Sequence, residues 1–437
     1  MQRTLSEKLE TPVAGEYDVI VAGAGPAGVP AALAAARSGA RTLLVESGSC
    51  LGGTWTAGLL TWIFDFERSG IAGEIIERLN ARDARVETNR RRMVCFTYDV
   101  EAMKLILQEM CQESGIDTLL HTRIVAAQVD EQRRLRAAMS ESKSGRQAWL
   151  AKVFIDATGD GDLGAWAGCS FDMGSEDTGA LQPMTYYGAI VVQDHTKLAE
   201  YISFYKGANS HNQAYRAFKA YLADLGVHTS YGAPTLFQIR GNLLALMINH
   251  EYGVDATDAK QVTEASIRGR AEINHVVDIL TKSDGPFHGC LLALSAEYIG
   301  VREGRRLHGR YTVTTDDLKR GARFEDAIAR VRFGVDVHSP DPNKDKANSN
   351  LNIEARSYDI PLRALIAKDV DGLLMAGRCI SGDWIAHSSY RVTGEAVSMG
   401  EAAGILAATS SQTNRLPHEV PWAEIAEKVP ELPEYWD

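Results

Sequence analysis

The chain has 437 residues, enough to bury a large core and to form two or three domains or one large discontinuous domain. Its 45% hydrophobic and 24% charged residues are typical of an ordinary soluble globular protein. The 46 Lys and Arg residues against 57 Asp and Glu residues give a net charge of −11, which argues against nucleic acid or an anionic membrane as the main partner.

The sequence contains no clear signal for membrane insertion, secretion or disulfide formation. No apolar run reaches the length that spans a bilayer, and the first 16 residues lack the apolar segment of a signal peptide. The 6 cysteines are scattered without a C-x-x-C pair, so they predict neither a metal site nor a disulfide framework. We therefore expect a cytoplasmic protein with buried thiols and no membrane contact.

The stretch 17–46 carries the first motif. Its apolar run Val19–Ala22 is typical of a buried parallel strand. Three glycines in G-x-G-x-x-G spacing, an Ala-rich helical pattern and a second strand at Thr42–Val45 follow. This order of elements favours a dinucleotide-binding βαβ unit over a tight turn that holds no ligand.

Each glycine of this motif, and the acid that follows it, has a physical role. Gly23 permits the tight turn, Gly25 lets the backbone approach a pyrophosphate, and Gly28 lets the helix pack closely on the strand. Unpaired N–H groups at the helix start favour the phosphates. Glu46 follows the second strand, where a carboxylate accepts hydrogen bonds from a ribose 2′-OH, and an acid there argues against NADP.

The next segment is rich in glycine and aromatic residues. Gly52, Gly53 and Thr54 predict a loop whose backbone lies close to the cofactor, with a plain surface turn as the alternative. The four aromatic residues that follow could line a substrate pocket, although clustered aromatics are more often core. They are Trp55, Trp62, Phe64 and Phe66.

Helices and strands alternate up to residue 164. Asp99 is a good N-cap for an amphipathic helix that ends near Glu113, and Leu119–Val129 has the pattern of a strand. The polar segment 130–147 predicts a β-hairpin or meander. A buried strand then leads into a second set of glycines at 159, 161 and 164, which lacks the helix, strand and acid of a second nicotinamide site.

The pattern changes between 179 and 363. Strand-like runs at Tyr186–Val192 and Leu243–Asn249 accompany a long helix at Thr257–Leu280, with Thr257 as the expected cap. Thr314 with Asp317 predicts a capping box for a short helix. We interpret this region as a substrate domain inserted into the cofactor domain.

The chain resembles the FAD-dependent oxidoreductases of the glutathione-reductase-like superfamily, and within them a bacterial group known only by that general name. The resemblance covers roughly residues 16 to 410. Its markers are GAGPAG at 23–28, GGTWTAG at 52–58, FIDATGDGDLG at 154–164, QPM at 182–184, REGRRLHGRYTVTTDDL at 302–318, DVH at 336–338, YDIPLRAL at 358–365 and AGRCISGD at 376–383.

The resemblance implies FAD rather than NAD as the cofactor. It places Glu46 at the adenosine ribose, the backbone near Ile124 at the adenine, and the N-terminus of a late helix at the flavin pyrimidine edge. A helix N-terminus there stabilises the negative charge of reduced flavin. The implied FAD-binding residues are Gly23, Gly25, Pro26, Ala27, Gly28, Glu46, Ser47, Gly53, Thr54, Ile124, Thr158, Gly159, Gly382, Asp383, Val392 and Thr393.

Candidates for the chemistry lie near that late helix. A flavin dehydrogenase needs a base or acid for the substrate proton, and His387 is the first candidate, with a structural hydrogen bond as the alternative. Arg391 could clamp a substrate carboxylate or phosphate, or make a structural ion pair. Tyr390, where the family commonly has Thr, could donate to a substrate oxygen or pack. His338, oriented by Asp336 two residues earlier, is a second acid/base candidate, and a salt bridge explains the same spacing.

The prediction is an α/β protein: a Rossmann-like FAD-binding domain with an inserted mixed α+β substrate domain. The FAD-binding domain is expected to comprise 16–60, 93–168 and 366–412, the substrate or cap domain 61–92 and 169–365, the polar lead-in 1–15, and the C-terminal surface tail 413–437. No metal is expected, and a homo-oligomer is left open.

The expected function is hydride transfer between a small polar organic substrate and the flavin N5, by a dehydrogenase or oxidase with an unidentified electron acceptor. Two alternatives stay open. One is a flavin monooxygenase that needs NAD(P)H and oxygen, and the other is an accessory electron-transfer flavoprotein subunit.

Overall fold

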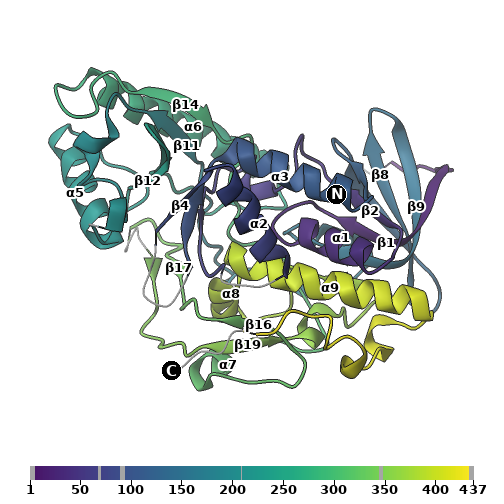
Figure 1. Ribbon diagram of the computed structural model, residues 1–437. Helices are drawn as coiled ribbons and strands as arrows, with labels where there is room; N and C mark the ends of the chain where they lie inside the picture. The colour runs from purple at the N-terminus through teal and green to yellow at the C-terminus, as the bar shows by residue number, and fades with distance from the viewer. Residues whose placement is uncertain (1–4, 67–69, 89–93, 208, 344–347, 433–437) are drawn as a thin grey trace.

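A seven-stranded sheet forms the centre of the computed structural model, which describes residues 5–66, 70–88, 94–207, 209–343 and 348–432 (Figure 1). The strand order is β6-β2-β1-β9-β8-β7, with β20 also paired to β9. The strands are β1 (Val13–Ala22), β2 (Thr42–Val45), β6 (Asp117–Leu119), β7 (Arg123–Val129), β8 (Leu135–Ser142), β9 (Gly145–Asp156) and β20 (Leu373–Met375). Strand β1 thus begins inside the predicted lead-in 1–15.

The parallel part of this sheet is the predicted dinucleotide-binding unit. β1 pairs in parallel with β2 and β9, β2 with β6, and β9 with β20. β7, β8 and β9 are antiparallel neighbours, and the hairpin predicted at 130–147 is formed by β8 and the start of β9. Residues Val19–Ala22 are fully buried, as their continuous apolar run predicts. The carboxyl ends of these strands therefore meet at one edge of the sheet.

Helices cover the parallel strands. They are α1 (Gly28–Arg37), α2 (Gly70–Ala81), α3 (Val100–Glu113), α4 (Asp162–Trp166) and α9 (Thr393–Thr413). The long α9 lies beside α1 (Figure 1), and a Cβ added at Gly400 or Gly404 would overlap the carbonyl oxygens of Ala27 and Ala31. Glycine at these two positions therefore allows α9 to approach α1 closely. Asp99 caps α3 as predicted.

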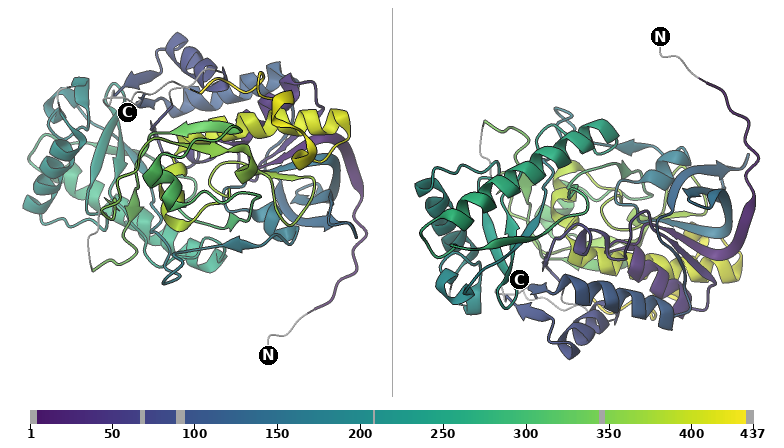
Figure 2. Two further views of the ribbon diagram at one scale, coloured as in Figure 1. Left: turned by 90° about the horizontal axis from the view of Figure 1, so that it is seen from below. Right: turned by 90° about the horizontal axis from the view of Figure 1, so that it is seen from above.

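A second, four-stranded antiparallel sheet lies at the opposite end of the molecule from β8 and β9 (Figures 1 and 2). Its order is β12 (Thr235–Arg240), β13 (Leu243–Met247), β11 (Gly188–Val191) and β14 (Leu291–Ser295), with α5 (His211–Asp224) and α6 (Ala259–Lys282) alongside. The predicted Thr257 cap of α6 is wrong: the cap is Asp258, whose carboxylate accepts from the N–H groups of Lys260 and Gln261. Thr257 instead donates to Asp255.

Shorter elements connect the two sheets. Three of them, β3 (Trp62–Ile63), β5 (Phe96–Tyr98) and β4 (Arg85–Glu87), form a small sheet. The others are β10 (Phe171–Asp172) with β15 (Arg306–Leu307), β16 (Ala327–Val331) with β19 (Tyr358–Pro361), β17 (Val337–His338) with β18 (Asn348–Ser349), and the helices α7 (Thr315–Arg320) and α8 (Trp384–Tyr390). The predicted capping box of Thr314 and Asp317 begins α7.

Two large apolar clusters form the core. The first surrounds the central sheet and also includes buried residues between 307 and 366, and the second is formed mainly by residues 184–299 around the second sheet. The segment 307–366 therefore packs with the central sheet, although the predicted cap domain extends to 365. Among the described residues, no helix has both the length and the apolar character needed to cross a membrane.

Candidate functional site

A cavity of about 1080 Å³ lies between the central sheet and the second sheet. Small-molecule sites usually measure about 300–1,000 Å³, so this one can hold a large ligand or two ligands together. The predicted cofactor-binding residues that line it are Gly23, Gly25, Pro26, Ala27, Glu46, Ser47, Gly53, Thr54, Ile124, Thr158, Gly159, Val392 and Thr393. Gly28, Gly382 and Asp383 are not among the lining residues. We call the part formed by these listed residues the dinucleotide half.

The glycine turn after β1 is crowded on one side and open on the other. Gly23 has a φ of +91°, and a Cβ there would lie 2.5 Å from the carbonyl oxygen of Ala157. A Cβ at Gly28 would overlap the carbonyl oxygen of Gly23, whereas a Cβ at Gly25 would meet nothing within 4 Å. Gly25 therefore presents bare backbone to the cavity, as a pyrophosphate site requires.

The Glu46 carboxylate is fixed at the end of β2. Its Oε2 accepts from the N–H of Ala24 at 2.7 Å, and its Oε1 accepts from the N–H of Gly48 at 2.7 Å. The chain from Leu119 to Thr122 passes beside it, because the Glu46 N–H donates to Leu119 and the Thr122 N–H donates to Glu46. This detour divides the strand predicted at 119–129 into β6 and β7.

Two further turns complete this half. Gly53 begins a short 3-10 helix, and a Cβ on it would lie 2.9 Å from the Cα of Gly25, so the two glycine turns touch. On the other side, the buried Asp156 carboxylate accepts from the Thr158 N–H at 3.0 Å and the Thr158 hydroxyl at 2.7 Å. Burial raises the pKa of Asp156 to about 6. The carboxylate thus holds the loop that starts at Thr158.

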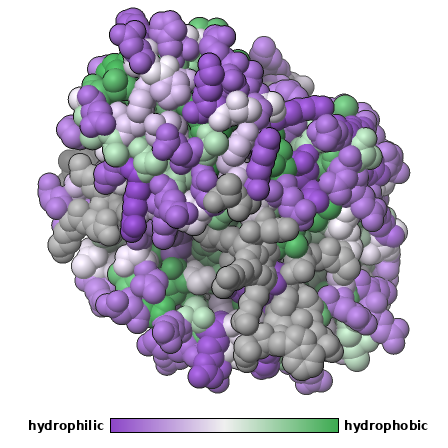
Figure 3. All heavy atoms as spheres, turned by 60° about the vertical axis from the view of Figure 1, so that its left-hand side comes forward, coloured by the Kyte–Doolittle hydropathy of each residue, from purple (hydrophilic) through white to green (hydrophobic). Residues whose placement is uncertain are grey.

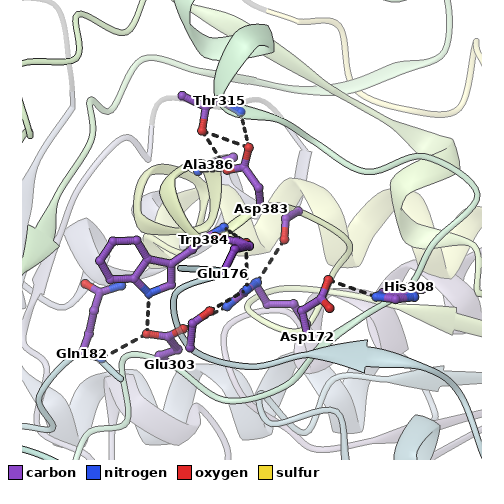
Figure 4. Close-up of polar contacts among 12 residues, drawn as sticks. Asp172, Glu176, Gln182, Glu303, His308, Thr315, Asp383, Trp384 and Ala386 are labelled. Carbon is purple, nitrogen blue, oxygen red and sulfur yellow. Dashed lines mark hydrogen bonds and ion pairs between the residues drawn. The ribbon is translucent and has the colours of Figure 1, made fainter. Parts of the chain in front are cut away.

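The start of α9 faces the cavity through Val392 and Thr393. Among the described residues no side chain caps this helix, so its first N–H groups can interact with a negatively charged group. Asp383 has a different position, at the start of α8 (Figure 4), where it accepts from the N–H of Ala386 at 2.7 Å and from the N–H of Thr315 at 2.5 Å. Its observed contacts are those of a helix cap, and the cofactor contact of Gly382 and Asp383 stays a prediction.

Charged and aromatic side chains form the rest of the cavity, which we call the substrate half. Its lining includes Trp62, Phe64, Tyr187, Tyr231, Phe237, Phe333, Arg302, Asp336, His338 and Arg391. The Asp336 carboxylate lies 3.3 Å from Nε2 of His338 and 3.4 Å from the Arg391 guanidinium. Nδ1 of His338 lies 3.1 Å from Nε2 of His250. The side chains at 336 and 338 therefore point to the same side, as the strand spacing predicts.

Burial governs the charges of this cluster. It lowers the pKa of His338 to about 4, with Arg302 acting in the same direction, and it lowers the pKa of His250 well below the usual value. Burial alone would raise the pKa of Asp336, but His338 and Arg391 reverse the effect and lower it. At neutral pH the cluster therefore contains a carboxylate, two neutral imidazoles and charged guanidinium groups.

His387 and Tyr390 lie outside the cavity lining. Both side chains are fully buried, and neither ring nitrogen of His387 makes a hydrogen bond of standard geometry among the described residues, although the backbone of Arg378 lies near enough to act on its pKa. Burial lowers the pKa of His387 well below its usual value. The Tyr390 hydroxyl donates to the carbonyl oxygen of Ile380 at 3.1 Å, and its ring meets His387 edge-on. The structure thus brings His338 and Arg391 together in the cavity lining and leaves the side chains of His387 and Tyr390 outside it.

Several residues of the substrate half carry no local sequence signal. Tyr187 and Tyr231 line the cavity, and His250 contacts His338 from outside the lining. These three residues are far apart in the sequence and meet only when the second sheet forms. One sequence signal could have identified Tyr187. In the strand predicted at 186–192, neighbouring side chains point to opposite faces, so Tyr186 and Tyr187 cannot both lie in the same layer. Of the aromatic residues near the first motif, Trp62 and Phe64 line the cavity, whereas Trp55 and Phe66 belong to the core.

A family model described as FAD dependent oxidoreductase matches residues 18–429. The chain belongs to this family. No curated protein matches it. Similar solved structures include a geranylgeranyl bacteriochlorophyll reductase-like protein from Thermoplasma acidophilum, at 14% identity over 95% of this chain and 83% of that one with a TM-score of 0.46. A myxobacterial chondrochloren halogenase is 10% identical over 95% and 78% of the two chains with a TM-score of 0.47. These likenesses are too distant to assign a substrate.

FAD is the cofactor of this oxidoreductase, and the dinucleotide half fits it. The open side of Gly25 leaves room for a ligand directly against the backbone, and the cavity continues from there to the uncapped start of α9. In the Rossmann-like arrangement, Glu46 would hold the ribose and the turn at Gly23–Gly28 the pyrophosphate. The outer surface on the side of the second sheet is largely hydrophilic, with apolar side chains in small patches (Figure 3).

Proposed function

We propose that this FAD-dependent oxidoreductase transfers a hydride between a small polar organic substrate and the flavin. The observation that carries the proposal is the single cavity, because it joins a dinucleotide half to a substrate half that contains Arg302, His338 and Arg391. When bound, FAD supplies the hydride acceptor or donor. The protein then has to bind the substrate, orient it and handle one proton.

His338 is our candidate for the proton. With a pKa of about 4 it is neutral at pH 7, and Asp336 orients it by accepting from Nε2–H, so a proton can be taken up at Nδ1. In this proposal Nδ1 exchanges its hydrogen bond to His250 for one to the substrate. Arg391 holds Asp336 through the carboxylate and through the backbone carbonyl oxygen at 2.8 Å. Arg391 is therefore a positioning residue for the acid/base pair.

The second set of glycines supports a single dinucleotide site. A Cβ at Gly164 would overlap Cδ1 of Leu307, and a Cβ at Gly161 would lie 3.0 Å from Cγ of the same side chain. These glycines therefore allow Leu307 to pack against α4. A nicotinamide site in this place would have to displace that packing, which favours direct reduction by a substrate over a monooxygenase.

The test is the visible spectrum of the purified protein under anaerobic conditions, recorded before and after addition of hydroxy acids, amines, sugars and NAD(P)H. We expect one class of organic compound to bleach the flavin without NAD(P)H. Bleaching by NADH alone would favour the monooxygenase, and a protein that no organic compound or nicotinamide reduces would favour an accessory electron-transfer subunit. A protein that binds no FAD would refute the proposal.

A further inference from the structure

Arg302 is a buried cation without an anionic partner. Its side chain lines the substrate half with 9% of its surface exposed, and no carboxylate among the described residues lies within ion-pair distance of it. Its hydrogen bonds go to neutral acceptors: the carbonyl oxygen of Pro183 at 2.7 Å and the hydroxyl of Thr185 at 2.5 Å. Burying an uncompensated charge is costly, so an anion from outside the chain is the expected partner.

Other buried guanidinium groups in the same molecule are neutralised. Arg306 pairs with Glu303 at 2.9 Å, Arg332 with Asp65 at 3.1 Å, and Arg391 with Asp336 at 3.4 Å. All three acidic partners are buried or nearly buried. Each of these three guanidinium groups therefore has a carboxylate partner within the protein, whereas Arg302 has none among the described residues.

The charges around the substrate half leave a positive excess. Arg302 and Arg391 face one carboxylate, Asp336, and the two histidines beside them are neutral. The other acidic residues of the cavity lining are already occupied: Glu46 accepts from backbone N–H groups, Asp160 pairs with Arg378 at 2.7 Å, and Asp162 pairs with Arg305 at 2.9 Å. The exposed Arg216 and Lys219 of α5 also line the cavity and add to the excess. A negative group on the substrate would offset the buried part of it, at Arg302.

One wall of the substrate half is formed by aromatic rings. Trp62 lies at ring-centroid distances of 3.9 Å from Phe64 and 4.2 Å from Phe237, and Phe64 lies 5.2 Å from Phe333. Packed rings of this kind suit a flat apolar group and give it no hydrogen-bond partners. The substrate half thus combines an aromatic wall with one buried cation, Arg302, that has no carboxylate partner among the described residues.

We propose that the substrate is an organic anion, with one carboxylate bound by Arg302 and a flat apolar body packed against the wall of Trp62, Phe64, Phe237 and Phe333. This rests on the proposed function, because it fills the same cavity beside the cofactor. A planar guanidinium matches a carboxylate with two parallel hydrogen bonds, which a neutral amide cannot reproduce. Arg302 is therefore assigned a specificity-determining role.

The experiment is a titration of the flavin absorbance of the FAD-loaded protein with matched ligand pairs. The pairs are phenylacetate and phenylacetamide, 3-phenylpropionate and its amide, and indole-3-acetate and its amide. We expect the wild type to bind at least one carboxylate about 10-fold or more tightly than its amide, as a charge-assisted pair in a buried site should give. Arg302→Met should remove this preference, and Arg302→Lys should keep part of it, with amide affinity unchanged in both.

The control is Arg310→Met, which removes a half-exposed arginine that pairs with Asp371 and lies outside the cavity lining. It should keep the wild-type preference. A wild type without preference for any carboxylate, or an Arg302→Met protein that retains it, overturns the proposal. An Arg302→Met or Arg302→Lys protein that is folded but loses FAD also overturns it, because the cation would then serve the cofactor. Binding needs no turnover, so carboxylate preference without flavin reduction would refute only the proposed function.

Discussion

The two halves of the cavity are formed by different parts of the residues. The dinucleotide half is made largely of backbone: glycine turns in contact with each other and the N–H groups at helix starts. The substrate half is made of side chains, including a histidine–carboxylate pair, two arginines and a cluster of aromatic rings. Adding a side chain in the dinucleotide half should therefore reduce FAD binding or stability. Replacing a side chain in the substrate half should reduce activity or substrate binding and leave the fold intact.

The largest expected effect comes from the glycines of the first turn. Gly28→Ala puts a Cβ onto the carbonyl oxygen of Gly23, so the turn must open, and we expect loss of FAD together with about 1–3 kcal/mol of stability. Gly25→Ala meets no protein atom within 4 Å and should unfold like the wild type. Its Cβ enters the cofactor space, so FAD affinity alone should fall. Thermal unfolding and flavin content of the purified variants measure both quantities.

The two variants form a matched pair, since each adds one methyl group to the same turn. Equal unfolding temperatures for both would contradict the packing explanation of Gly28. Undiminished FAD binding by Gly25→Ala would contradict the placement of the pyrophosphate against Gly25.

The second prediction compares two histidines. His338→Gln should lower kcat/KM about 10²–10⁴-fold, the range of a lost general base, while FAD stays bound. His387→Leu should leave kcat/KM close to the wild type, because His387 does not line the cavity. It also removes two buried ring nitrogens that make no hydrogen bond of standard geometry among the described residues, so the free energy of unfolding should be unchanged or higher. Steady-state kinetics with the substrate found in the spectral screen and denaturant unfolding provide the measurements.

The opposite results for these two histidine variants would contradict the assignment of the catalytic role to His338. A large loss of activity in His387→Leu with normal flavin content would return the catalytic role to the residue that the sequence pattern favours. Normal activity of His338→Gln would leave Asp336 and His338 as a salt bridge with no part in the chemistry.

The same division explains what could be predicted from the sequence. The dinucleotide half depends on residues close together in the chain, so glycine spacing, the strand pattern and the acid Glu46 predict its elements and most of its lining. Local capping signals were equally informative at Asp99 and Thr314. At α6 the neighbouring Asp258 takes the position that Thr257 was expected to occupy, a difference of one residue that propensity alone does not resolve.

The substrate half depends on contacts between distant segments. Nothing in the spacing shows that Arg302 lacks a carboxylate or that His250 reaches His338, because both facts arise only when the second sheet packs against the central one. At His387 the sequence suggested a role in the site that the structure does not support. Its position just before α9 suggested proximity to the flavin, but the seven-residue α8 turns this side chain into the protein interior. The direction of a side chain on so short a helix is set by packing.

The smallest expected effect lies outside both halves, at Glu401 in the middle of α9. Burial raises the pKa of this carboxyl to about 7 from 4.5, and it accepts from the N–H of Ile71 at 3.3 Å. The folded state therefore holds a proton that the unfolded chain releases between about pH 4.5 and pH 7, so this contribution to stability is lost as the pH rises through that range. Glu401→Gln, which stays neutral, should reduce the decline by about 1–3 kcal/mol.

Denaturant unfolding at several pH values between 5 and 8 measures this slope, with Glu427→Gln as the control because Glu427 is exposed and makes no ion pair among the described residues. An unchanged slope in Glu401→Gln would mean that the carboxyl is already ionised in the folded protein. Flavin content is the second measurement, since the first turn of α9 lines the cavity and Glu401 lies about two turns later. A change in FAD affinity would show that the packing of α9 against α2 affects cofactor binding. FAD binding would then depend on side-chain packing as well as on the backbone of the dinucleotide half.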